Sequence, residues 1–175
     1  MQGRYLAKLA PSGKYLVLSG APIDHNSALL RQGAMNILKP LADRGEIRIV
    51  ADQPIADWRP EVAKGLMQRA LTAHSGEIRA VLAPNDATAG GVIQALTLYG
   101  LDGQVLVTGQ DADADAVRRI VAGTQAMTVF KDTRQLASAA FGAAMSFAAG
   151  GSAPGNTRVP NGKMDVPSLL LEPVT

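Results

Sequence analysis

The sequence predicts an α/β fold in which an open parallel sheet of about five strands carries helices on both faces. Short apolar runs alternate with longer segments whose apolar residues recur every three or four positions, as in strands alternating with amphipathic helices. The runs are continuously apolar, which is typical of strands buried on both faces. Hydrophobic residues make up 47% of the 175 residues and aromatic residues only 4%, so the core must be aliphatic. Such a sheet is Rossmann-like.

Each strand is predicted from a short, mostly apolar run that ends in a polar turn. Runs of this length, bounded by turn residues, are more consistent with strands than with helices. The strands are expected at residues 14–20, 46–51, 78–83, 104–108 and 125–130.

Each helix is predicted from apolar residues three and four positions apart and from residues that favour helix ends. Proline suits a first helical turn, and glycine suits the position just beyond the last turn. The helices are expected at residues 26–44, 60–73, 86–99, 113–122 and 133–149, with Pro60 as a start and Gly45, Gly100, Gly123 and Gly150 as stops.

Three segments organise the chain. Residues 14–151 form the lobe that carries the predicted sheet, without an internal linker. Residues 1–13 are expected to be the end of a preceding helix or a hinge. Residues 152–175 are rich in proline, glycine and asparagine and are expected to be a C-terminal tail or hinge segment.

Composition argues against several classes of site and partner. The chain has no cysteine and only two histidines, far apart, so neither a metal site nor a cofactor is expected. The net charge is +2 without a run of basic residues, which argues against a nucleic-acid partner. No apolar run of about 18 residues predicts a membrane span. The N-terminal residues lack the apolar core of a signal peptide.

Ligands of open parallel sheets bind beyond the carboxyl ends of the strands, so the turns that follow the strands are the expected site. Asn85 and Asp111 are the leading candidates, because each precedes an expected helix cap and is expected to point into the crevice. Asn26, Asp86 and Asp113 occupy the expected cap positions, and a cap is the more frequent role there.

Two further residues bring different chemistry to these turns. Trp58 is the only tryptophan and lies in a polar loop, where it either covers one end of the sheet or forms a flat apolar wall for a ring. Lys131 directly follows the fifth expected strand and is either a surface lysine or a donor to the ligand. Carboxylates, amides, one lysine and one tryptophan suit a neutral polyol better than a phosphate.

The same turns carry a resemblance to a known family. The matching segments are residues 20–26, 57–61, 85–96, 109–113, 122–131 and 165–168. Over residues 14–171 the chain resembles the C-terminal half of the periplasmic sugar-binding proteins of ABC importers, in particular those for D-xylose. Such proteins hold the sugar between two Rossmann-like lobes joined by a three-segment hinge. The family's N-terminal lobe has no counterpart in the chain.

The resemblance implies a non-enzymatic lobe that binds D-xylose or a similar monosaccharide. In the periplasm, the intact protein would deliver this sugar to an ABC permease. It implies sugar contacts at Asn26, Trp58, Asn85, Asp111 and Lys131, and less directly at Asp24, His25 and Arg31. His25 stands where the family is expected to carry asparagine.

Two other functions remain open. A sugar-sensing effector domain of a regulator or sensor shares the fold. A receiver-like phosphoacceptor domain would also have five strand–helix units, but it needs an acidic pair after the first strand and a phosphorylatable aspartate after the third. The chain offers Asp24 alone and the step Asn85-Asp86. An enzyme is least favoured, because no activated nucleophile or acid–base pair is evident.

Self-association is also expected. Without a second lobe, the crevice face and the hinge segments are exposed, including Trp58 and residues 169–171. Exposed apolar patches of this kind commonly drive association, so a homo-oligomer is expected at high concentration.

Overall fold

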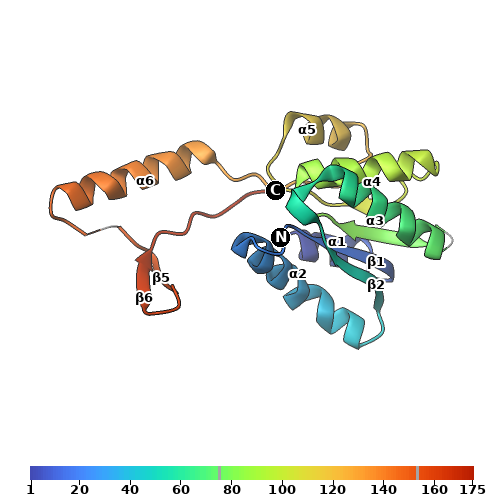
Figure 1. Ribbon diagram of the computed structural model, residues 1–175, viewed down its shortest axis with the longest axis horizontal. Helices are drawn as coiled ribbons and strands as arrows, with labels where there is room; N and C mark the ends of the chain where they lie inside the picture. The colour runs from blue at the N-terminus through green and yellow to red at the C-terminus, as the bar shows by residue number, and fades with distance from the viewer. Residues whose placement is uncertain (75, 153) are drawn as a thin grey trace. The chain divides into compact units, whose positions relative to one another are not determined.

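The computed structural model describes residues 1–74, 76–152 and 154–175. The chain divides into unit 1, residues 1–129 with Thr175, and unit 2, residues 130–174 (Figure 1). The strands of unit 1 are β1 (Gly13–Ser19), β2 (Ile47–Pro54), β3 (Ile78–Leu82) and β4 (Leu106–Val107). Its helices are α1 (Gln2–Leu9), α2 (His25–Asp43), α3 (Pro60–Ala73), α4 (Asp86–Leu98) and α5 (Ala114–Val121), with a 3-10 turn η1 (Ala56–Trp58).

The four strands form one parallel sheet in the order β2-β1-β3-β4, as the fold class predicts. Consecutive side chains of β1 enter opposite cores, because side chains alternate across a strand. Leu16 and Leu18 join the core formed with α3 and α4. Tyr15 and Val17 join the core formed with α1 and α2. Helices therefore cover both faces of the sheet (Figure 1).

The fifth expected strand is present as a line of hydrogen bonds rather than as a full strand. Within residues 125–130, only Met127 forms a parallel bridge, to Thr108. The amide of Ala126 nevertheless donates to the Val107 carbonyl over 2.8 Å, and the amides of Gly109 and Asp111 donate to the Met127 and Val129 carbonyls over 3.0 and 2.9 Å. This segment therefore continues the sheet beside β4.

The N-terminal segment is an integral part of unit 1. Leu6 of α1 is fully buried, and the Gln2 side chain donates to the carbonyls of Ala83 and Gly109 over 2.7 and 3.0 Å. The Tyr15 hydroxyl lies 3.0 Å from the Leu6 carbonyl oxygen, and burial raises its pKa to about 12. Helix α1 therefore completes one core and reaches the carboxyl edge of the sheet.

Unit 2 is a loop of chain closed at its base. The amide of Phe130 donates to the Val174 carbonyl over 2.8 Å, and the amide of Val174 returns a bond to the Phe130 carbonyl over 3.0 Å. Between them lie α6 (Thr133–Ala148) and an antiparallel hairpin of β5 (Thr157–Pro160) and β6 (Asp165–Ser168). The sequence groups residues 133–151 with the lobe, whereas this closure groups them with the tail.

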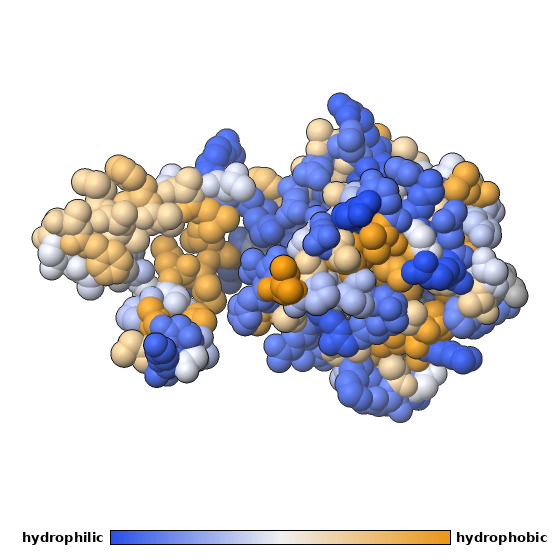
Figure 2. Space-filling view, in the orientation of Figure 1, coloured by the Kyte–Doolittle hydropathy of each residue, from blue (hydrophilic) through white to orange (hydrophobic). Residues whose placement is uncertain are grey.

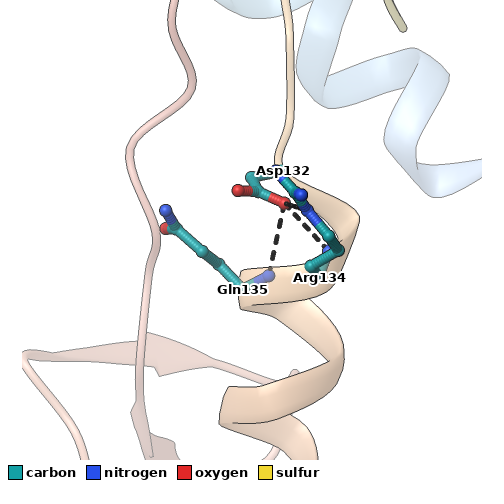
Figure 3. A network of polar contacts seen from close by, with 3 residues as sticks. All are labelled: Asp132, Arg134 and Gln135. Atoms are coloured by element: carbon teal, nitrogen blue, oxygen red, sulfur yellow. Dashed lines mark hydrogen bonds and ion pairs between the residues drawn. The ribbon is translucent and has the colours of Figure 1, made fainter.

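Helix α6 begins at a well-defined cap and exposes apolar side chains. Asp132 accepts hydrogen bonds from the amides of Arg134 and Gln135 over 3.0 and 3.4 Å (Figure 3). The Arg134 side chain also donates to Asp132, from Nε over 3.3 Å, and this side-chain hydrogen bond is the main reason that the Asp132 pKa is lowered. No residue of α6 is buried, and apolar side chains gather over α6, whereas the hairpin shows polar and apolar side chains together (Figure 2). The large exposed ones on α6 are Leu136, Phe141, Met145 and Phe147.

Helices α3 and α4 approach closely at a glycine. A Cβ atom at Gly91 would lie 2.1 Å from the Pro60 carbonyl oxygen, so a side chain there would force the helices apart. The absence of a side chain at Gly91 therefore serves the contact of α4 with α3. Alanine fits Gly33 of α2, where nothing lies within 4 Å of the added atom.

We expect Gly91→Ala to lower the stability of the chain by about 1–3 kcal/mol, the usual cost of overpacking. The matched change Gly33→Ala should instead raise stability by about 0.5–1 kcal/mol, because alanine is the better helix former. Urea unfolding followed by circular dichroism measures both. Equal effects of the two substitutions would contradict the close approach at Gly91.

Candidate functional site

The carboxyl edge of the sheet in unit 1 is the candidate site. The chain leaves β1 to form β2 on one side and then returns to form β3 on the other. Such a reversal of strand order leaves a crevice beyond the strand ends, and ligands of open α/β sheets bind there.

The structure brings four of the five predicted sugar contacts to this edge. In the order of the sheet, Trp58 follows β2, Asn26 follows β1, Asn85 follows β3 and Asp111 follows β4. Lys131 belongs to unit 2, directly after Phe130.

Trp58 lies against the end of the central strand. A Cβ atom at Gly20 would lie 2.2 Å from Cζ2 of Trp58, so the indole ring contacts the backbone just after β1. The loop is anchored by Ile55, whose side chain is fully buried and whose amide donates to the Ser19 carbonyl over 2.8 Å. Asp57 and Trp58 both have left-handed backbones, with φ of 53° and 56°. The half-buried ring is therefore held at the edge by contacts on both sides of the loop.

Asn85, not Asp86, caps α4. The Asn85 Oδ1 atom accepts from the Thr88 amide over 3.0 Å and from the Thr88 hydroxyl over 2.7 Å, which forms a capping box. The expectation that Asp86 is the cap and that Asn85 is free of this role is therefore wrong. The cap occupies the oxygen of Asn85, so any hydrogen bond that its side chain donates comes from the Nδ2 group.

The expectation for the turn that follows β1 is also wrong. Asp24 caps α2, since its side chain accepts from the Asn26 amide over 2.8 Å. Asn26 is therefore not the cap but an exposed residue in the first turn, next to exposed His25. Arg31 donates with Nε to Asp52 Oδ1 over 2.9 Å and with a second nitrogen to Oδ2, and these hydrogen bonds raise its pKa.

Asp111 lies in a strained turn. Its φ is 103°, and that of Ala112 is 56°, so two consecutive residues other than glycine have positive φ. Such conformations are costly and gather at functional sites. Asp113 begins α5 without a side-chain cap bond. Desolvation, followed by repulsion from Asp86 and Asp111, raises the pKa of Asp113.

The sequence does not reveal the polar residues buried behind this turn. Asp86 is fully buried, and Gln110 and Gln125 are nearly so. A Cβ atom at Gly109 would lie 2.0 Å from Asp86 Oδ1. The glycine is therefore a local sequence signal that a buried side chain lies against the backbone here. The described residues contain no cluster of three or more acidic or histidine side chains arranged to hold a metal ion. Nor does any helix among them have the length and apolarity to cross a membrane.

Residues 1–152 match the model of a periplasmic binding protein domain. The chain is 46% identical over 174 residues to the D-xylose-binding periplasmic protein of Escherichia coli (strain K12), which covers 99% of this chain and 53% of that protein. It is 37% identical over 172 residues to the multiple sugar-binding periplasmic protein SbpA of Azospirillum brasilense, covering 91% of this chain and 48% of that one. The chain thus spans about half the length of the curated relatives it matches.

A solved structure agrees with these relatives. The ABC transporter solute binding protein from Clostridium phytofermentans with bound β-D-glucose superposes with a TM-score of 0.86 at 35% sequence identity, over 99% of this chain and 59% of that one. With a family model that matches most of its residues, the chain belongs to the family of periplasmic binding protein domains.

Proposed function

We propose that this chain is one lobe of a monosaccharide-binding protein of an ABC importer, with D-xylose as its preferred ligand. The observation that carries the proposal is a half-buried tryptophan at the carboxyl edge of a parallel sheet that also bears amide and carboxylate side chains. A sugar offers an apolar ring face and several hydroxyls, which match an indole ring and these polar groups. The relatives that are named for xylose and for multiple sugars support this ligand class.

Each proposed contact has a chemical role. Trp58 stacks on the sugar ring, Asp111 accepts from hydroxyls, and the Nδ2 group of Asn85 donates to one. Asn26 both donates and accepts, and Lys131 is assigned the role of a donor. Hydrogen bonds to charged groups each contribute about 1.5–3 kcal/mol, so a few of them are enough to hold a sugar.

Asp24, Arg31 and His25 play a supporting part in this proposal. Asp24 fixes the start of α2 and with it the position of Asn26. Arg31 is committed to Asp52 on β2, which ties α2 to the edge strand. His25 is exposed and directly precedes Asn26, so it lies close enough to influence the contact that Asn26 makes with the sugar.

The proposed role is binding and delivery, without a catalytic step. The names of the relatives place them in the periplasm and, for the solved structure, with an ABC transporter. By the same reasoning, the partners proposed for the intact protein are an ABC permease and a second lobe that supplies the other half of the sugar contacts. A receiver-like role is not supported, because the carboxylate of Asp86 is fully buried and already accepts three hydrogen bonds.

We expect the 175-residue chain alone to bind D-xylose only weakly, because one lobe leaves about half of the sugar in water, whereas complete sites bury roughly 70–90% of a ligand. Joining the chain to the N-terminal half of the Escherichia coli relative should strengthen binding by orders of magnitude. Titration calorimetry measures both proteins. If the joined protein binds no monosaccharide, the proposed function is wrong.

We expect Gly20→Ala to displace the ring of Trp58, because the added atom would overlap it. The fluorescence of the only tryptophan should change, and the affinity of the joined protein for D-xylose should fall. Gly33→Ala is the matched control, since its added atom meets nothing within 4 Å. Unaltered fluorescence and affinity in Gly20→Ala would contradict the proposed stacking.

We expect the isolated chain to form dimers or larger oligomers as its concentration rises, because α6 exposes Leu136, Phe141, Met145 and Phe147. Replacing Phe141 and Phe147 with serine should shift the chain toward the monomer, and the joined protein should be monomeric if the second lobe covers α6. Light scattering over a wide concentration range checks this. A wild-type chain that stays monomeric throughout contradicts it.

A further inference from the structure

A buried polar network centred on Asp86 lies behind the turn that carries Asp111. The carboxylate of Asp86 is fully buried and accepts three hydrogen bonds. Its Oδ1 atom accepts from Gln125 Nε2 over 2.8 Å, and its Oδ2 atom accepts from the Thr128 hydroxyl and the Asp113 amide, each over 2.9 Å. We call Asp86, Gln125 and Thr128 the Asp86 network.

The network fixes the Asp111 turn on both sides of that residue. The amide of Asp86 donates to the Gln110 carbonyl over 2.8 Å, and its carboxylate accepts from the Asp113 amide. Between them, the Ala112 amide donates to the Thr128 hydroxyl over 3.1 Å, and this hydroxyl donates onward to Asp86. Residues 110, 112 and 113 are therefore all connected to Asp86 directly or through one hydroxyl.

Arg119 fixes the orientation of the Gln125 side chain within the network. Its Nε atom donates to Gln125 Oε1 over 2.9 Å, so the amide nitrogen of Gln125 must face Asp86. A second guanidinium nitrogen donates to the backbone carbonyl of Asp86, also over 2.9 Å. The groups that form hydrogen bonds with the Asp86 carboxylate are all donors, and a carboxylate is the side chain that accepts from all of them.

The turn held in this way is the strained one. Asp111 and Ala112 have φ of 103° and 56°, where residues with a Cβ atom are disfavoured. Such a conformation persists only where surrounding contacts over-determine it. The hydrogen bonds of the Asp86 network to residues 112 and 113 are contacts of this kind.

We propose that Asp86 is a positioning residue that, through Thr128, holds the Asp111 turn in its left-handed conformation and so presets Asp111 for the sugar. The inference rests on the proposed function in its last clause only. Asp86 itself does not touch the ligand. Its contribution is that the turn is already ordered when the sugar arrives, which removes an ordering cost from binding.

Amide hydrogen exchange measured by NMR on the 175-residue chain tests the network without any ligand. In Asp86→Asn the side chain turns an NH2 group toward donors, and in Thr128→Val the acceptor of the Ala112 amide is lost. Both variants should speed exchange of the Ala112 and Asp113 amides about tenfold or more, as expected for the loss of a buried hydrogen bond. Thr128→Ser keeps the hydroxyl and should behave as wild type. Asp102→Asn makes the same chemical change at an exposed carboxylate and serves as the control.

Titration of the same chains with D-xylose, followed by NMR shifts, tests the consequence for binding. Asp86→Asn and Thr128→Val should weaken the affinity about tenfold, while Thr128→Ser and Asp102→Asn should stay within about twofold of wild type. Adding Ala112→Gly to Asp86→Asn should restore much of the lost affinity, because glycine takes positive φ without strain. If Asp86 only stabilised the fold, adding Ala112→Gly would not restore the affinity.

The outcomes separate the two proposals. If Asp86→Asn folds, as circular dichroism reports, and leaves both the exchange of Ala112 and the affinity unchanged, the positioning role is overturned. If Asp86→Asn does not fold, Thr128→Val against Thr128→Ser decides the same question. If the wild-type chain and the joined protein bind no monosaccharide, the proposed function is wrong, while the exchange rates still decide whether the Asp86 network holds the turn.

Discussion

Parallel pairing of β1 with both β2 and β3 is the constraint on which the rest of unit 1 depends. These neighbours pair both edges of β1, and the helices that connect parallel strands cover both of its faces. Leu16 and Val17, consecutive in β1, accordingly belong to different cores. The same pairing aligns the carboxyl ends of all strands at one edge, so segments far apart in the sequence converge there. The apolar core and the polar edge are therefore two consequences of one pairing pattern.

The edge is stiffened by helix α1 as well as by the sheet. The Gln2 side chain bridges the carbonyls that follow β3 and β4, and the Tyr5 hydroxyl donates to the Ala126 carbonyl over 2.8 Å. The bonds of Gln2 give partners to the carbonyls of Ala83 and Gly109, which lie beyond the last residues of β3 and β4. The N-terminal residues thus belong to the candidate site as supports, although they carry none of its proposed contacts.

The sequence predicts the elements well, because their signals are local. Apolar periodicity and end residues lie within a few positions of each other, and β1, α2, α3, β3 and α4 all lie close to their expected bounds. The unit to which α6 belongs is not decided by local signals. Its periodicity predicts a helix at residues 133–149, but the grouping of that helix follows from the pairing of Phe130 with Val174, more than 40 residues apart. No pattern within α6 contains that information.

The candidate site shows the same limit at the scale of single residues. Asn85 and Asp86 are adjacent, and both are good helix caps, so residue type alone does not decide between them. The decision is made by tertiary partners: Gln125 and Thr128 supply donors that draw Asp86 inward, and Asn85 takes the cap. Asp24 and Asn26 present the same ambiguity, and there the more N-terminal residue is again the cap.

The loops that follow β2 and β4 are both strained, and they are held in place by different kinds of contact. Each contains two consecutive residues with positive φ, Asp57 with Trp58 and Asp111 with Ala112, and each must be held against the tendency to relax. The first is held by apolar contact, because the Trp58 ring lies on Gly20 and Ile55 is fully buried. The second is held by hydrogen bonds that end on the buried carboxylate of Asp86.

This division matches the chemistry proposed for each loop. An indole ring used for stacking needs a fixed plane, which close packing on a backbone provides, and its exposed face is then ready for a sugar ring. A carboxylate that accepts from hydroxyls needs a fixed origin and direction, which hydrogen bonds to the backbone on both sides of Asp111 provide. Because both loops are ordered by contacts within unit 1, a sugar bound as proposed would not have to order them, and more of its contact energy would contribute to affinity.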